Sequence, residues 1–286
     1  MSEEFKNTIN WYPGHMTGAK RKMQEDLKLV DCIIEILDAR VPLSSRNPDI
    51  DELGKGKGRV ILLNKIDLAD PSETKRWVDL YTSQGMQVVP LDSRNRRDAL
   101  KVSAAVKEAC KEKIERDRRR GIKNRPVKAM VAGIPNVGKS TFINSFVGRA
   151  SAKTGNKPGV TRGNQWIRMS NEINLLDTPG ILWPKFEDMS VGYKLAFIGS
   201  INDNILDISD ICFEMLKYLQ KYYCNNISER YKLEDDDTLS LMEKIALEKK
   251  CLKKGGVPDI EKASRLILDD LRNGRLGRIT FDRVER

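Results

Sequence analysis

The sequence has one histidine, five cysteines and no long apolar run. The cysteines are odd in number and never form Cys-x-x-Cys, which argues against a disulfide framework or a zinc site and favours free thiols in a reducing compartment. The longest apolar runs, such as residues 60–63, are far shorter than the roughly 18 residues that a membrane span needs. The first residues do not resemble a secretory signal. We therefore expect a cytoplasmic protein without a membrane partner.

Positive charge is abundant but unevenly distributed. The chain of 286 residues carries a net charge of +10, of which residues 1–130 contribute +7, residues 131–200 contribute +4 and residues 201–286 contribute −1. Such a bias favours a polyanionic partner, although a solvated basic surface is an equally simple explanation. The length predicts about two domains, and 40% hydrophobic residues suffice for a packed core.

Apolar, β-branched runs alternate with helical stretches in the first two-thirds of the chain. This alternation predicts a doubly wound α/β domain, a parallel sheet with helices on both faces and ligands at the carboxyl ends of its strands. The expected strands are residues 30–37, 60–63, 87–91, 127–132 and 173–176, and the expected helices are residues 72–84 and 98–118. From about residue 190 amphipathic stretches at 210–223, 239–252 and 259–271 predict a smaller, all-helical domain.

The strongest motif is G-I-P-N-V-G-K-S at residues 133–140, which matches G-x-x-x-x-G-K-[ST] and lies between an expected strand and an expected helix. In such a loop backbone N–H groups and the helix N-terminus bind phosphate oxygens. Lys139 would reach the terminal phosphates as a catalytic group, and the Ser140 hydroxyl would bind Mg²⁺. The expected nucleotide-binding residues are Asn136, Val137, Gly138, Lys139, Ser140 and Thr141.

A second motif, D-T-P-G at residues 177–180, follows the expected strand 173–176. Asp177 at the strand end suits a further Mg²⁺ contact, and the Gly180 N–H can meet the γ-phosphate. Thr161 lies in a Gly/Pro-rich loop between the two motifs, and its hydroxyl can bind Mg²⁺ when a triphosphate is bound. The predicted metal ligands are therefore Ser140, Thr161 and Asp177.

A third motif, N-K-I-D at residues 64–67, follows the strand expected at 60–63. The Asp67 carboxylate can accept paired hydrogen bonds from guanine, which adenine cannot donate. The Lys65 stem would cover the base, and Asn64 would brace the loop. Asp92 and Ser93, after the strand expected at 87–91, match the remaining guanine-side loop only loosely.

The order of these motifs differs from that of an ordinary GTPase, in which the phosphate loop comes first. Here the guanine motif precedes both the phosphate loop and D-T-P-G, as after a circular permutation. Residues 111–128, which carry nine basic side chains, would then link the original termini. This segment is either a solvated helix end or a phosphate-binding surface.

The chain resembles the circularly permuted GTPases that act in ribosome assembly. Besides the motifs above, the resemblance rests on W-Y-P-G-H-M (11–16), D-A-R-V-P (38–42), S-R-N-P (45–48), D-T-P-G-I-L-W-P-K-F (177–186) and G-R-I-T-F (277–281). It implies GTP hydrolysis on the maturing large ribosomal subunit, stimulated by that subunit. We expect a GTPase domain at residues 1–188 and an rRNA-binding helical domain at residues 189–286, in a monomer.

The sequence leaves open which residue activates the attacking water. Ordinary GTPases often place Gln directly after D-x-x-G, but Ile181 stands there. His15 matches the histidine proposed as catalytic in the family, and its reference pKa suits proton transfer near neutral pH. Alternatively, Asn136 matches an Asn that helps to hold K⁺ in related GTPases.

Two other functions are compatible with the motifs. One is a GTP-gated RNA-binding switch in which hydrolysis is incidental. The other is a P-loop metabolic kinase, which the guanine motif and the lack of an acceptor-substrate motif disfavour.

RNA contacts in the helical domain would come from local clusters, because that domain has no net positive charge. The candidates are a lysine cluster, Lys249, Lys250, Lys253 and Lys254, and a group of arginines, Arg272, Arg275 and Arg278.

Overall fold

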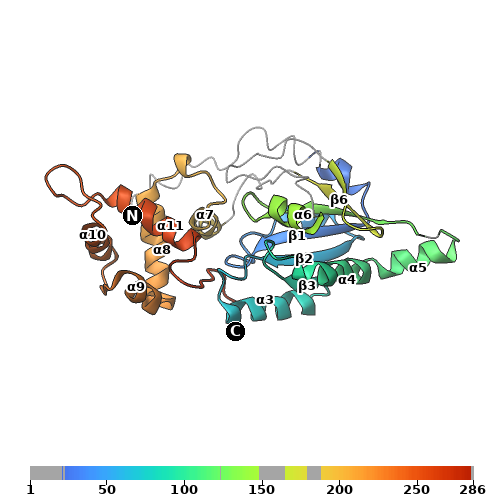
Figure 1. The fold of residues 1–286 in the computed structure, drawn as a ribbon, viewed down its shortest axis with the longest axis horizontal. Coiled ribbons are helices and arrows are strands. Elements are labelled where there is room, and N and C mark those ends of the chain that lie inside the picture. The colour runs from blue at the N-terminus through green and yellow to red at the C-terminus, as the bar shows by residue number, and fades with distance from the viewer. Residues whose placement is uncertain (1–20, 22, 123, 148–164, 179–187, 285–286) are drawn as a thin grey trace. The chain divides into compact units, whose positions relative to one another are not determined.

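The computed structural model describes residues 21, 23–122, 124–147, 165–178 and 188–284, which fall into two compact units (Figure 1). Described residues up to 178 form the first unit, and residues 188–281 form the second. Asp282, Arg283 and Val284 belong to the first unit again. None of the described helices is both long and apolar enough to cross a membrane.

A six-stranded sheet forms the centre of the first unit, with the strand order β3-β2-β1-β4-β6-β5. Its strands are β1 (Cys32–Asp38), β2 (Gly58–Asn64), β3 (Gln87–Pro90), β4 (Val127–Ala132), β5 (Gln165–Arg168) and β6 (Ile173–Asp177). All neighbours pair in parallel except β5, which is antiparallel to β6. The five expected strands are present. Strand β5 was not predicted from the sequence. It is a four-residue edge strand in which Trp166 and Arg168 are exposed, so it has no apolar run.

Helices cover both faces of this sheet, as expected. On one face Trp77 and Tyr81 of α3 (Pro71–Ser83) pack with Leu37. On the other face Cys32 lies beside Cys110, which follows directly after α4 (Ala99–Ala109). Cys32 and Leu37 point to opposite faces because side chains alternate along a strand. The first unit also contains α2 (Pro48–Leu53), α5 (Lys111–Arg119) and α6 (Lys139–Val147).

Local sequence explains where several helices begin. The Asp70 carboxylate accepts hydrogen bonds from the N–H groups of Ser72 and Glu73, and Pro71 occupies the first turn of α3. The single helix predicted at 98–118 is instead two helices, α4 and α5. They meet at Cys110, whose backbone (φ −109°, ψ 11°) departs from helical geometry without a Gly or Pro.

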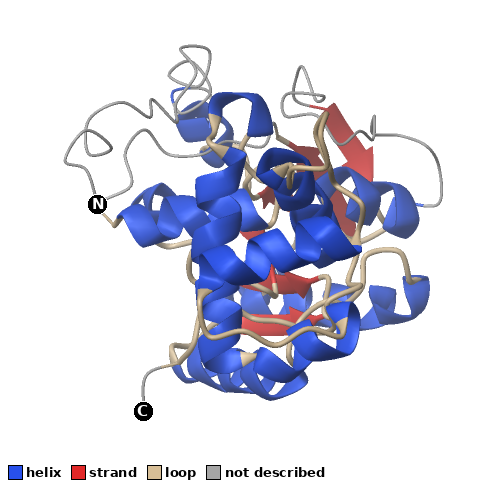
Figure 2. Cartoon of the chain, turned by 90° about the vertical axis from the view of Figure 1, so that its left-hand side faces the viewer, coloured by secondary structure: helices blue, strands red, loops and turns tan. Residues whose placement is uncertain are grey.

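The second unit is helical (Figure 2). It contains α7 (Met189–Phe197), α8 (Ile208–Tyr222), α9 (Cys224–Tyr231), α10 (Thr238–Glu248) and α11 (Ile260–Arg272), and no strand among its described residues. The amphipathic stretches predicted α8, α10 and α11 but not α7 or α9. Asp270 of α11 is fully buried and accepts hydrogen bonds from Arg230, Tyr231 and Arg275. This charged cluster satisfies every polar atom of the buried carboxylate.

After the helical unit the chain returns to the first unit. The buried Asp282 carboxylate accepts from the Ser44 N–H at 2.6 Å and the Ser44 hydroxyl at 2.8 Å. The Trp77 indole N–H donates to the Asp282 carbonyl at 3.0 Å, and Arg283 pairs with Glu73. We expected the helical domain to run to residue 286, but these contacts attach residues 282–284 to the first unit.

We predict that Asp282→Ala destabilises the first unit by about 2–3 kcal/mol, because it removes a charged acceptor and leaves the Ser44 N–H without its partner. Calorimetric or urea unfolding checks this value. Asp79→Ala, which removes an exposed carboxylate from α3 of the same unit, is the matched control and should change stability by less than about 0.5 kcal/mol. Equal stability of the two variants would contradict the prediction.

Candidate functional site

The phosphate loop lies at the carboxyl end of β4, directly before α6. Gly133 (φ +152°) and Gly138 (φ +98°) have backbone conformations that other residues rarely adopt. A Cβ on Gly133 would lie 2.6 Å from the Ile36 carbonyl oxygen, and one on Gly138 would lie 2.4 Å from the Asn64 amide nitrogen. Glycine is therefore required at both positions for the loop to approach the neighbouring strands.

The Lys139 ammonium group lies inside this loop. It donates to the carbonyl oxygens of Gly133 at 3.0 Å and Ile134 at 3.1 Å. The residue is 9% exposed, and burial lowers its pKa to about 8 although Asp177 opposes the shift. The first turn of α6 adds the positive end of the helix dipole. Together they create a positive site suited to phosphate groups.

Asp177 ends β6, where it is the register partner of Val131 in β4. Its side chain is buried, and this burial raises its pKa to about 6 while Lys139 lowers it. The Oδ1 atom is buried without a hydrogen-bond partner among the described residues. A buried carboxylate oxygen that lacks a donor suits a hard cation, and Mg²⁺ sites commonly combine one carboxylate with a hydroxyl and substrate phosphates. The donor set of Asp177 and Ser140 therefore fits Mg²⁺.

Asn64 connects the guanine motif to two other loops. It is 1% exposed, its amide nitrogen donates to the Val137 carbonyl at 2.7 Å, and its amide oxygen accepts from the Ser93 N–H at 2.9 Å. The carboxyl ends of β2, β3 and β4 are thus joined through one side chain. The loosely matching Ser93 lies in this arrangement and is 4% exposed.

Lys65 forms a second link between the guanine motif and the phosphate loop. It has a left-handed backbone (φ +63°), and its ammonium group donates to the Asn136 carbonyl at 2.7 Å and pairs with Asp38 at 3.0 Å. Burial lowers the pKa of Lys65, and Asp38 opposes this. Burial would raise the pKa of Asp38, but Arg40 and Lys65 outweigh it and hold the pKa well below its ordinary value. Asp38 was not predicted as a site residue. A carboxylate at the end of a buried strand could have indicated one, because ligands bind at the carboxyl ends of such strands.

Asp67, the residue expected to select guanine, is engaged by Arg94. The guanidinium group donates to Asp67 at 2.7 Å and to both carboxylate oxygens of Asp92. This pairing lowers the pKa of Asp92 and raises that of Arg94. The Arg94 side chain is 66% exposed and that of Asp67 31%. Arg94 therefore covers part of the hydrogen-bonding capacity that guanine would use.

The structure brings the described site residues to the same edge of the sheet, at the carboxyl ends of β1, β2, β3, β4 and β6. Ser140 and Thr141 are half-buried in the first turn of α6. The predicted residues His15, Thr161 and Gly180 lie outside the described residues.

Three kinds of comparison identify similar proteins. The family described as 50S ribosome-binding GTPase matches residues 128–251. Ribosome biogenesis GTPase A of Priestia megaterium is 46% identical, with 96% of each chain covered, and the Thermotoga maritima protein of that name is 33% identical, with 97% of this chain and 95% of its own length covered.

Among solved structures, GDP-bound YlqF superposes with a TM-score of 0.68 at 28% identity, covering 93% of this chain and 100% of YlqF. GNP-bound YlqF from T. maritima gives a TM-score of 0.65 at the same identity, with 93% and 98% covered. These matches confirm the expected fold class, a doubly wound P-loop GTPase domain with permuted motif order followed by a helical domain.

We predict that Arg94→Ala strengthens GDP and GTP binding by up to about fivefold. An exposed ion pair contributes at most about 1 kcal/mol, and guanine must displace the one that Arg94 forms with Asp67. Titration with a fluorescent guanine nucleotide measures this change. Arg97→Ala is the control, because Arg97 is an exposed arginine of the following turn with no ion pair to a described residue. Weaker binding by Arg94→Ala would show that Arg94 contacts the nucleotide.

Proposed function

The chain belongs to the ribosome biogenesis GTPase A family, and we propose that it binds the maturing large ribosomal subunit and hydrolyses GTP there. One observation supports guanine nucleotide binding most strongly. Asn64 and Lys65 of the guanine motif both donate hydrogen bonds to carbonyl groups of the phosphate loop. The ribosomal partner is supported by the family description and by the names of the relatives. Such a partner implies work in the cytoplasm.

In this proposal each loop has one task. Asp67 and the Lys65 stem select guanine, while Asn64, Asp92 and Ser93 shape the base pocket. Backbone N–H groups of residues 136–141 hold the phosphates, and Lys139 neutralises the charge that develops as the terminal phosphoryl group leaves. Ser140, Asp177 and, outside the described residues, Thr161 would hold Mg²⁺, and Gly180 would meet the γ-phosphate. Bound Mg²⁺ supplies further charge neutralisation at the phosphates.

Water activation is assigned to His15, since Ile181 cannot hydrogen-bond water. A K⁺ ion held with the help of Asn136 is the alternative. The Asn136 backbone is left-handed (φ +62°) and its carbonyl accepts from Lys65. This conformation places a polar residue at the turn of the phosphate loop, which is compatible with either a bracing or an ion-binding role.

The helical unit offers one exposed basic cluster for rRNA. Lys249, Lys250, Lys253 and Lys254 lie between α10 and α11, and the last three are exposed. The other candidate group, Arg272, Arg275 and Arg278, is less suitable for binding RNA than expected. Arg272 is bound to Asp203 and to the Ala196 and Phe197 carbonyls, and Arg275 pairs with Asp270. Arg272 therefore stabilises the helical unit.

Turnover and co-sedimentation with large subunits test the proposal together. We predict GTP-dependent co-sedimentation, and turnover that rises when subunits are added. His15→Ala should bind GTP and subunits normally but lower stimulated turnover by about 10²-fold, the scale of a positioned acid–base group. The K⁺ alternative is tested with Asn136→Ala. If K⁺ activates hydrolysis, wild-type turnover should be faster in K⁺ than in Na⁺, and the substitution should remove this difference.

Each outcome has a definite meaning. Normal stimulated turnover of His15→Ala would contradict its catalytic role. Nucleotide-dependent binding with negligible turnover would favour the RNA-binding switch. Absence of subunit binding by the wild-type protein would contradict the proposed partner.

A further inference from the structure

Helix α5 continues from α4 beyond Cys110 and extends away from the sheet (Figure 1). None of its residues is buried. Its inner side is held by Lys113, which pairs with Asp31 at 3.1 Å and with Asp117 at 3.5 Å. The outer side of α5 therefore contributes nothing to the packing of the domain.

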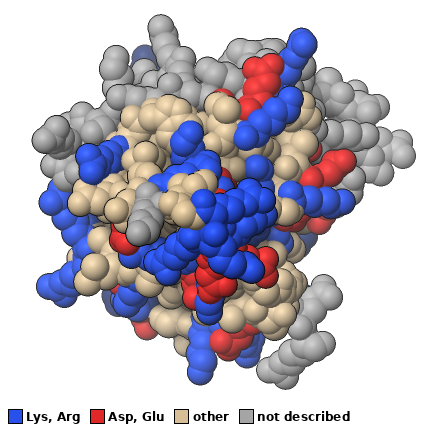
Figure 3. Space-filling view, turned by 90° about the vertical axis from the view of Figure 1, so that its right-hand side faces the viewer, with Lys and Arg blue, Asp and Glu red and all other residues tan. Residues whose placement is uncertain are grey.

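Arg116, Arg118 and Arg119 of α5 and Arg120 directly after it form what we call the α5 arginine cluster. All four are exposed, and none has an ion pair or side-chain hydrogen bond with another described residue. Residues 111–128 hold nine basic and three acidic residues. A large share of the excess charge of the whole chain is thus concentrated here, and Figure 3 shows Lys and Arg side chains gathered on this end of the molecule.

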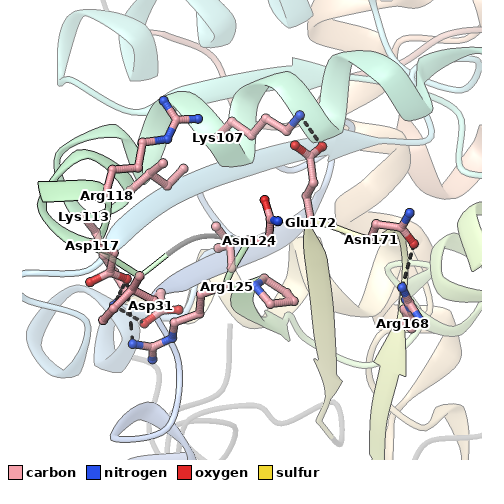
Figure 4. Close-up of a pocket in the computed structure, with 14 residues that line it drawn as sticks. Asp31, Lys107, Lys113, Asp117, Arg118, Asn124, Arg125, Arg168, Asn171 and Glu172 are labelled. Atoms are coloured by element: carbon pink, nitrogen blue, oxygen red, sulfur yellow. Dashed lines mark hydrogen bonds and ion pairs between the residues drawn. The ribbon is translucent and has the colours of Figure 1, made fainter. Parts of the chain in front are cut away.

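A groove of about 1030 Å³ lies beside the α5 arginine cluster (Figure 4). Its acidic residues are each neutralised within the groove. Asp31 pairs with Lys113, Asp117 with Lys113 and Arg125, and Glu172 with Lys107. Arg118 and Arg168 also line the groove, so its net charge is positive.

This groove cannot serve the nucleotide site. Its lining includes Asp31, Val127 and Glu172, which stand at the amino ends of β1, β4 and β6. The nucleotide loops lie at the carboxyl ends of the same strands, on the opposite edge of the sheet. A ligand bound in the groove must therefore be a second ligand, distinct from the nucleotide.

The chemistry of the surface favours a phosphate backbone. Arginine presents a planar fork of donors that matches phosphate oxygens. Among the described residues no aromatic side chain lines the groove, so the groove itself offers unpaired bases no ring to stack on. A membrane is disfavoured because α5 contains one apolar residue, the half-buried Ile114. Contacts to phosphates without base readout are typical of binding to double-stranded RNA.

We propose that the α5 arginine cluster and the adjoining groove bind the phosphate backbone of a ribosomal RNA helix. This surface lies on the GTPase domain and is additional to any contact of the helical unit. The inference rests on the proposed binding to the large subunit.

The test uses the full chain with Arg116, Arg118, Arg119 and Arg120 all changed to Gln. Its affinity for large subunits and for protein-free large-subunit rRNA is measured at several salt concentrations. The slope of log affinity against log salt should become shallower by about 3 to 4, since each of the four phosphate contacts contributes about 0.7–0.9. GDP affinity and the melting temperature should not change, because the four side chains are exposed and form no ion pair or side-chain hydrogen bond with another described residue.

Two further variants make the result specific. Changing the same four residues to Lys keeps the charge and should preserve most of the slope. Changing Lys28, Lys55, Lys75 and Arg97 to Gln removes equal charge from exposed positions elsewhere on the GTPase domain and should alter the slope by less than about 1. An equal loss in this control would overturn the proposal in favour of a general charge effect.

The remaining outcomes separate the inference from the proposed function. If the wild-type protein binds subunits and the Gln variant binds with the same affinity and slope, the α5 inference is wrong and subunit binding stands. If the wild-type protein does not bind subunits, the proposed function itself fails. If the Gln variant loses subunit affinity but binds protein-free rRNA like the wild type, the partner of the cluster is an acidic protein surface, and the RNA proposal is wrong.

Discussion

The buried amide of Asn64 joins the two halves of the nucleotide site. Its nitrogen donates to the phosphate loop at Val137 and its oxygen accepts from Ser93. A buried amide that satisfies two backbone groups fixes their separation, because either group would lose its partner if the loops moved apart. The base-selecting residues and the phosphate-binding residues therefore keep one spacing, as a molecule that spans both requires.

The permuted order of the motifs does not disturb this arrangement, because the sheet determines which loops meet. Strands β1 and β4 are neighbours at the centre of the sheet, although 88 residues lie between Asp38, the last residue of β1, and Val127, the first residue of β4. The segment between β3 and β4 starts at the carboxyl ends of the strands with Asp92 and Ser93 and reaches their amino ends with α5, where Lys113 pairs with Asp31. Nucleotide chemistry and the proposed RNA contact thus occupy opposite edges of one sheet, and each edge can carry its own charge pattern.

The sequence predicted the parts of the site that depend on short-range pattern. Apolar runs followed by N-K-I-D, G-x-x-x-x-G-K-S and D-T-P-G correctly located the carboxyl ends of β2, β4 and β6. It did not predict the pairing of Arg94 with Asp67, because that contact depends on how two adjacent loops orient their side chains. Nor did it predict the attachment of Asp282 to Ser44, since partners 238 residues apart leave no periodic signal. The edge strand β5 was too short and too exposed to show a pattern.

Binding of GDP by Asn64→Ala tests the central claim most directly, with Asn64→Asp, which keeps an acceptor for Ser93 but sets a buried carboxylate oxygen against the Val137 carbonyl, as the harsher comparison. Unsatisfied buried backbone groups cost about 1–3 kcal/mol each, so the account predicts that GDP affinity falls by at least about tenfold in Asn64→Ala and further in Asn64→Asp, in which two acceptors face each other. The measurement is isothermal titration of GDP into each folded variant, with the folded fraction checked by circular dichroism. Wild-type GDP affinity in a folded Asn64→Ala protein would contradict the account.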